Sequence, residues 1–197
     1  MKRVVVLLVA SACGQPAVKP DGGTAEQPIS TMQITGAPCA ISIEQWPLGD
    51  ATHFTQGAPL TWPSNPPASG PHYSRWAAFQ EFTTAVPRGN YVHSLEHGAV
   101  VLLYNCDLVD AATCDAIKTA LRAATTSLPD DSKCSGLPTR VRTVMTPDSA
   151  LTEPLVAVSW GFIYRAACVD QTSLNAFASA HYAQGPEDLC AAGVTSF

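Results

Sequence analysis

Residues 99–105 read Ala-Val-Val-Leu-Leu-Tyr-Asn, and this stretch decides the fold class of the chain. Its centre is a continuous apolar run that is dense in Val, Leu and Tyr, and turn-forming residues lie on both sides of it. Short apolar runs of this composition are typical of buried strands. We therefore predict a buried strand at residues 99–105, on which the neighbouring segments pack.

The segments after this strand predict two helices and further strands. Asp110 can cap a helix that ends before Pro129, and its apolar residues recur at helical spacing as Ile117, Ala120, Leu121, Ala124 and Leu128. Apolar and polar residues alternate weakly over residues 140–145, as in an edge strand. Residues 155–164 form the longest strand candidate. A second helix is expected over residues 172–183, with His181 at the edge of the core. This order predicts an α+β domain with a small mixed or antiparallel sheet and two packed helices.

The segment before the buried strand is irregular. From Cys39 to Tyr91 the chain carries seven prolines, so any strands are short, and residues 40–44 and 58–62 are the candidates. We expect this long proline-rich N-terminal half to wrap the edge of the sheet.

The first residues have the features of an export signal. Lys2 and Arg3 precede a short apolar run, and the small residues 10–12 precede Cys13. The run is too short to span a membrane. We predict a signal peptide at residues 1–12, a lipid-anchored flexible tether at residues 13–38 and a single globular domain at residues 39–197. Cleavage at the same bond by the ordinary signal peptidase, without lipid, is the alternative.

Cysteine parity favours the lipoprotein hypothesis. The chain has seven cysteines, so a lipid on Cys13 leaves six, an even number suited to disulfides in an oxidising compartment. Several connectivities are open, and we expect Cys39 to pair with Cys190 because they lie near the two ends of the domain. The protein would then face the periplasm or the cell exterior, with the membrane as its partner through the lipid. The scattered basic residues predict no nucleic-acid partner.

Four of the five histidines fall between residues 53 and 97. Prolines on both sides of Gly70 stiffen the chain before His72, which can hold that ring in a fixed place. His93 and His97 have the i, i+4 spacing that lets two imidazoles share a metal ion. Together with Glu96 they match the inverted zinc-peptidase signature, which requires a long helix. Because Gly98 and the apolar strand follow at once, we expect only a single helical turn or a loop here.

These residues predict a metal site built from histidine. Neutral imidazole suits zinc, copper, nickel and iron, and the cysteines are expected to be tied up in disulfides. We therefore predict that a copper or zinc ion, and no organic cofactor, is held by His53, His72, His93 and His97. Glu96 is either a further ligand or the acceptor that orients one ring.

Two long motifs resemble a known bacterial family. Residues 65–73 read Asn-Pro-Pro-Ala-Ser-Gly-Pro-His-Tyr, and residues 92–100 read Val-His-Ser-Leu-Glu-His-Gly-Ala-Val. Together they resemble the family called domain of unknown function 3105. His53, Ser159-Trp160-Gly161 and Gly185-Pro186-Glu187 extend the resemblance over about residues 45–188. It implies an exported or membrane-tethered protein of the cell envelope, and it implies no mechanism.

Three functions therefore stay open at this point. The first is a lipoprotein that handles or senses copper or zinc through the histidine cluster. The second is a metal-dependent hydrolase or oxidase that uses the same residues, with Glu96 as general base. The third is a non-catalytic interaction module in which the histidines only stabilise the scaffold. Cys-x-x-Cys, phosphate-loop and Gly-x-Ser-x-Gly motifs are absent from the sequence.

Overall fold

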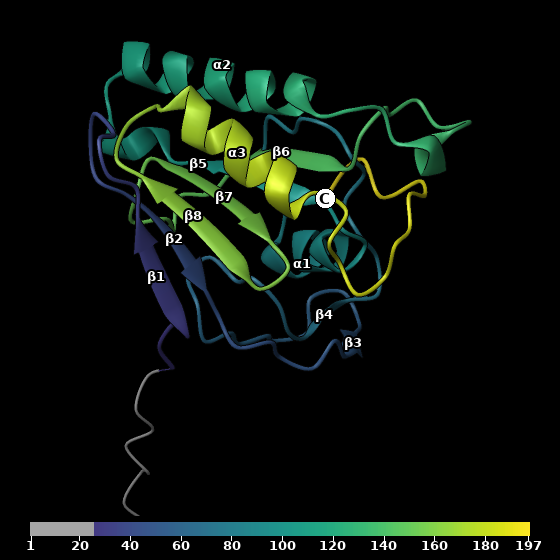
Figure 1. Ribbon diagram of the computed structural model, residues 1–197. Coiled ribbons are helices and arrows are strands. Elements are labelled where there is room, and N and C mark those ends of the chain that lie inside the picture. Colours follow the sequence, from purple (N-terminus) through teal and green to yellow (C-terminus); the bar gives the residue numbers. More distant parts are fainter. Residues whose placement is uncertain (1–25) are drawn as a thin grey trace, which may run out of the picture.

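The computed structural model describes residues 26–197, and a mixed six-stranded sheet lies at their centre (Figure 1). From one edge to the other the strands run β1 (Ser30–Gln33), β2 (Ile41–Gln45), β8 (Phe162–Ala166), β7 (Leu155–Ser159), β5 (Val100–Tyr104) and β6 (Thr143–Pro147). Neighbouring strands are antiparallel except β5 and β6, which are parallel. The predicted α+β class is thus confirmed. The predicted signal peptide and Cys13 lie outside the described residues.

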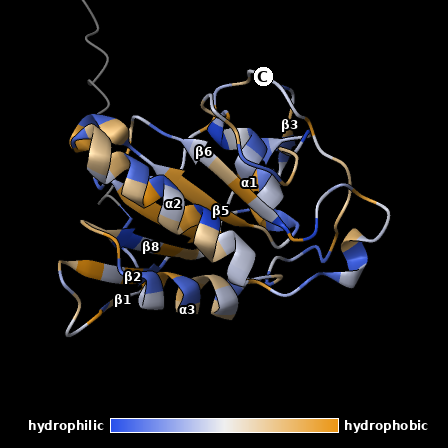
Figure 2. Cartoon of the chain, turned by 90° about the horizontal axis from the view of Figure 1, so that it is seen from above, coloured by the Kyte–Doolittle hydropathy of each residue, from blue (hydrophilic) through white to orange (hydrophobic). Residues whose placement is uncertain are grey.

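Three helices cover the two faces of the sheet. Helices α2 (Ala111–Ser127) and α3 (Gln171–His181) lie side by side on one face (Figure 2), and α1 (Arg88–Glu96) lies on the other. Side chains along a strand point alternately to opposite faces. Val100 and Leu102 accordingly pack with the residues of α2 and α3, whereas Val101 and Leu103 pack with α1. The central strand is therefore buried on both sides, as its continuous apolar run predicts.

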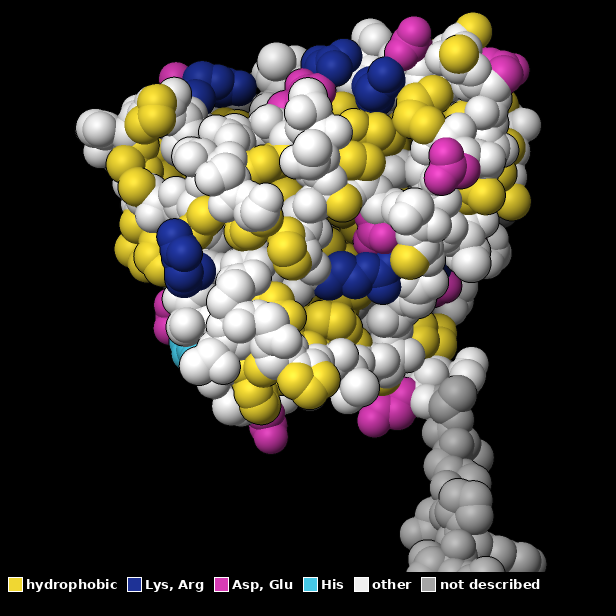
Figure 3. Space-filling model, turned by 180° about the vertical axis from the view of Figure 1, so that it is seen from behind, with side chains coloured by type: hydrophobic (Ala, Val, Ile, Leu, Met, Phe, Trp, Pro, Cys, Tyr) yellow, Lys and Arg dark blue, Asp and Glu magenta, His cyan; other side chains and the backbone are white. Residues whose placement is uncertain are grey.

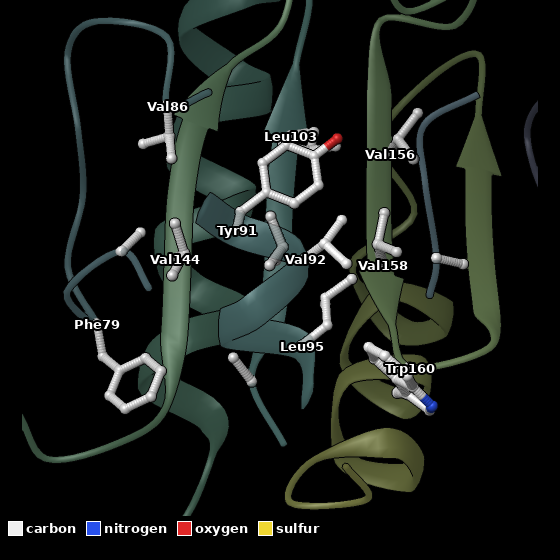
Figure 4. Close-up of a cluster of buried hydrophobic side chains, with 14 of the residues drawn as sticks. Phe79, Val86, Tyr91, Val92, Leu95, Leu103, Val144, Val156, Val158 and Trp160 are labelled. Atoms are coloured by element: carbon white, nitrogen blue, oxygen red, sulfur yellow. The ribbon is translucent and has the colours of Figure 1, made fainter. Parts of the chain in front are cut away.

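The α1 side of the core depends on three apolar residues of that helix. Tyr91, Val92 and Leu95 are fully buried and lie over β5, between Val144 of β6 and the valines of β7 (Figure 4). The opposite side of the helix faces the proline-rich segment, where two short strands pair in parallel. These are β3 (His53–Phe54) and β4 (His72–Tyr73). The remaining short elements are two 3₁₀ helices, Cys106–Leu108 and Ser132–Cys134.

Both long predicted helices form, and their first turns explain where they begin. The Asp110 side chain accepts a hydrogen bond of 2.7 Å from the Thr113 N–H, and Asp170 caps α3 in the same way. Helix α2 ends at Ser127, two residues before Pro129, and α3 ends at His181, two residues earlier than predicted.

Several local predictions are corrected. Residues 155–164 form two strands rather than one, because the chain reverses at Trp160-Gly161, where Gly161 has a φ of +83°. Residues 58–62 form no strand. Strand β1 falls inside the stretch predicted as a tether and pairs with β2, so the sheet begins earlier than predicted. Helix α1 has nine residues, which is more than the single turn expected.

Three disulfides link the six cysteines between residues 39 and 190. They join Cys39 to Cys168, Cys106 to Cys114 and Cys134 to Cys190. The predicted Cys39–Cys190 pair is wrong because β2 and β8 are neighbours in the sheet, which places Cys39 beside Cys168. Three disulfides are typical of a protein outside the cytoplasm. Among the described residues, no helix is both long enough and apolar enough to cross a membrane.

Candidate metal centre

Three segments of the chain bring the predicted ligands together. The parallel pairing of β3 and β4 places His53 directly opposite His72. Helix α1 lies against β4 (Figure 1) and carries His93, Glu96 and, as its C-cap, His97. Because Tyr91, Val92 and Leu95 occupy the face of α1 that packs in the core, positions 93, 96 and 97 turn toward β3 and β4.

The end of α1 is defined by a glycine. Gly98 adopts a φ of +81°, a left-handed conformation that side chains other than glycine rarely tolerate. This residue reverses the chain, so β5 begins at Val100, only two residues later. The end of the helix that Gly98 predicts is correct. The helix is longer than one turn because it extends upstream from this residue.

Four donor atoms converge on one point. Glu96 Oε2 lies 3.0 Å from His72 Nε2, 3.6 Å from His53 Nε2 and 3.8 Å from His93 Nε2. His53 Nε2 and His93 Nε2 are 3.4 Å apart, and all four atoms lie within 4.8 Å of one another. A tetrahedral ion with bonds of about 2.0–2.2 Å holds its ligand atoms about 3.3–3.6 Å apart. The observed spacing is thus close to that of a four-coordinate site.

Backbone carbonyls orient two of the rings. His72 Nδ1 lies 2.8 Å from the Gly70 oxygen, and His93 Nδ1 lies 2.6 Å from the Tyr73 oxygen. Because a carbonyl oxygen can only accept, each Nδ1 must carry the proton and donate it. The Nε2 lone pair of each ring then points into the cluster, which is the tautomer and orientation of most metal-ligating histidines.

Two buried acceptors therefore face each other at the centre. His72 Nε2 has no proton to donate, and Glu96 Oε2 is a carboxylate oxygen; within the described residues neither atom has a hydrogen-bond partner. Their separation is only 3.0 Å. Two acceptors at this distance repel each other unless a cation or an added proton lies between them.

Burial sets the protonation of these groups. It lowers the pKa of His93 to about 3, an effect that the neighbouring histidines increase, and it also lowers the pKa values of His72 and His97. The imidazoles of His72, His93 and His97 are therefore neutral at pH 7, which is the form that binds metals. Burial also raises the pKa of Glu96 to about 7, and the Glu187 carboxylate adds to the rise. The cluster thus disfavours the Glu96 anion until a cation is bound.

The four residues of the cluster differ in exposure to solvent. The His53 side chain is 45% exposed, whereas those of His72, His93 and Glu96 are almost completely buried. Viewed from behind, histidine shows only a small patch at the margin of the molecule (Figure 3). An ion would therefore reach the centre past His53.

His97 does not complete the four-histidine site that the sequence predicts. Its Nε2 lies 3.2 Å from Glu187 Oε2, and these two residues form a second, adjacent group with Glu96. The indole of Trp76 packs beside both His93 and His97, with ring centroids 5.2 and 4.7 Å away. The sequence alone predicts no role for Glu187, although its Gly-Pro-Glu motif belongs to the family resemblance.

His181 lies away from both groups. Its ring packs against Phe162 and Phe177, with centroids 4.3 and 4.6 Å away, on the side of the sheet covered by α3. Burial lowers its pKa. The histidine at the edge of the core is thus confirmed.

Comparison with known proteins agrees with the two sequence motifs. Residues 53–192, which contain both histidine motifs and Glu187, match the family described as protein of unknown function DUF3105. Neither the curated proteins nor the solved structures include a match to the chain. The chain belongs to the DUF3105 family.

Proposed function

We propose that this protein is an exported, lipid-anchored metal-binding protein that holds a copper or zinc ion in the cell envelope through His53, His72, His93 and Glu96. The observation that carries the proposal is the contact between His72 Nε2 and Glu96 Oε2, two buried acceptors 3.0 Å apart without hydrogen-bond partners in the described part of the chain. Burying such a pair costs several kcal/mol unless a cation, or a proton on Glu96, lies between the two atoms. A bound ion would remove that cost.

The donor set favours copper(II) or zinc(II). Three imidazole nitrogens and one carboxylate oxygen are borderline-to-hard ligands, which suit these divalent ions better than copper(I). The thiolates that would draw a softer ion are absent from the site, because the six described cysteines are paired in disulfides. For equal availability the affinity order favours copper(II) over zinc.

The number of protein donors supports binding rather than catalysis by this ion. Four donors fill a tetrahedral shell, whereas catalytic zinc sites keep one position for water or substrate. Glu96 lies within the shell instead of beside it, so it is poorly placed to act as a general base. These features favour storage, transfer or sensing of the ion.

The envelope location is part of the proposal. It rests on the basic and apolar residues before Cys13, on the small residues at positions 10–12 and on the even number of cysteines that remains. The three disulfides support it, because they persist in oxidising compartments.

Competition titration with copper(II) and zinc(II) tests the metal site. We expect sub-micromolar binding by the unaltered protein. Loss of a hydrogen-bond partner that orients a ligand lowers metal affinity roughly 10–100-fold. Loss of a buried ligand itself should lower the affinity further. The variants H72A and H93A should therefore weaken binding more than 100-fold.

The matched control is H181A, because His181 is the described histidine that lies outside both groups. Its affinity should equal that of the unaltered protein. Binding in the micromolar range or weaker, or binding that H72A and H93A leave unchanged, would refute the proposal.

A further inference from the structure

We propose that the site holds two cations, with Glu96 as the bridge between them: one ion among His53, His72 and His93, and a second bound by His97 and Glu187. This inference rests on the proposed function and adds a second metal position to it. The position is formed where the C-terminal segment, residues 182–190, crosses the end of α1 (Figure 1).

The donor atoms of the second position are already close together. His97 Nε2 lies 3.2 Å from Glu187 Oε2, and one ligand atom each of Glu96, His97 and Glu187 lies within 4.8 Å of the others. A carboxylate has two oxygens with several lone pairs, so it can bind two ions at once. Ions in two-metal sites are about 3.5–4 Å apart. The 4.7 Å between the centroids of the adjacent His93 and His97 rings is compatible with one ion at each ring.

Glu96 presents a buried acceptor atom between the two groups. Its side chain is only 5% exposed, and Oε2 has no hydrogen-bond partner among the described residues although it is aimed into the cluster. An unpaired buried carboxylate oxygen is costly. Coordination to a cation would satisfy Oε2, and a carboxylate can bind a second cation at the same time.

Anionic ligands are available for two ions. In the first group the Glu96 carboxylate is the anionic ligand, and histidine binds metals through neutral imidazole. Glu187 brings a second carboxylate to the same place, and its neighbour Asp188 turns instead to Arg142, 2.9 Å away, and to Lys133. Two carboxylates therefore face the site, which gives each of two ions one anionic ligand.

The backbone holds Glu187 firmly in position. Its N–H donates a hydrogen bond of 2.9 Å to the Glu96 carbonyl, and the Ala183 N–H donates one of the same length to the Gly98 carbonyl. The Cys134–Cys190 disulfide fixes the segment a few residues later. The Glu187 side chain is nevertheless 53% exposed, so water can complete the shell of the second ion.

Copper(II) titration of the full chain, followed by elemental analysis and electron paramagnetic resonance, tests the second position. We expect two equivalents of copper per chain. At two equivalents the spin count should fall well below two, because ions that share a carboxylate couple magnetically. The variant E187Q should bind one equivalent with a full, uncoupled signal.

Control variants separate the two proposals. E153Q alters a partly exposed carboxylate outside both groups and should keep two equivalents and the coupled signal. The unaltered protein and E187Q could each bind one equivalent of copper equally well, and H72A could bind none. That result would overturn the second position and leave the first. Two uncoupled equivalents in the unaltered protein would also overturn it. Absence of tight binding in every variant would instead refute the proposed function.

Discussion

Gly185 offers the most direct way to disturb the contact between the C-terminal segment and α1. A Cβ atom at this residue would lie 2.2 Å from the Glu96 carbonyl oxygen, 2.3 Å from the Gly98 nitrogen and 2.7 Å from the Leu95 oxygen. All three are backbone atoms, so no side-chain rotation can make room. We therefore predict that G185A pushes the segment away from the helix by about 1 Å, the shift that restores an ordinary carbon–oxygen contact.

The magnitude follows from the contacts that this shift breaks. Overpacking of a closely packed region costs about 1–3 kcal/mol. The hydrogen bonds from Glu187 to Glu96 and from Ala183 to Gly98 would weaken as well, at about 1 kcal/mol each. We expect G185A to lower the free energy of unfolding by about 2–5 kcal/mol.

Urea denaturation followed by tryptophan fluorescence measures this loss, and G136A is the control. Gly136 has a φ of +84°, and no atom lies within 4 Å of the place that a Cβ atom would take. Alanine there incurs only the left-handed backbone strain of about 1–2 kcal/mol. G185A should therefore cost more than G136A. An equal or smaller loss for G185A would refute the reasoning that the segment is held tightly against α1.

Other parts of the molecule give three more predictions. R142M leaves the buried Asp131 carboxylate without its guanidinium partner and should cost about 3–5 kcal/mol by urea denaturation. Burial raises the pKa of Asp131, but the hydrogen bonds from the Lys133 N–H and from Arg142 outweigh this effect and lower the pKa. The stability that the Asp131 carboxylate contributes is therefore present above its unfolded-state pKa and lost as the pH falls through its folded-state pKa. The stability of R142M should accordingly be less sensitive to acid, and an unchanged acid profile would contradict this. Adding zinc or copper at about 100 times the dissociation constant should stabilise the fold by about 2.7 kcal/mol, reversed by a chelator, whereas H72A should show no such gain. C13A should release the protein from membranes on fractionation, and a membrane-bound C13A would place the anchor elsewhere.

Local signals make the helices predictable. Helix α2 has a capping aspartate at its start, a regular apolar face and a proline just after its end, and each of these acts within a few residues of the chain. Strands β7 and β8 look like one strand in the sequence because the apolar run continues on both sides of Gly161. Only the positive φ of that glycine marks the turn, and an isolated glycine within an apolar run is a weak signal.

Contacts between distant segments cannot be predicted in the same way. Cys39 pairs with Cys168 because the Ala167 N–H donates to the Ala40 carbonyl across β2 and β8, a register that depends on the whole sheet. The histidine spacing predicts candidate metal ligands on α1. It does not predict that His97 pairs with Glu187, which reaches the site only because the last segment crosses back over α1.

We propose above all that three histidines and Glu96 hold an ion. This is tested most directly by anomalous diffraction from crystals of the zinc- or copper-loaded protein, measured on both sides of the absorption edge of the metal. The proposal predicts a peak about 2.0–2.2 Å from Nε2 of His53, His72 and His93 and from a carboxylate oxygen of Glu96. A loaded crystal with no peak at this point, or with metal only at residues outside the cluster such as His181, would contradict it.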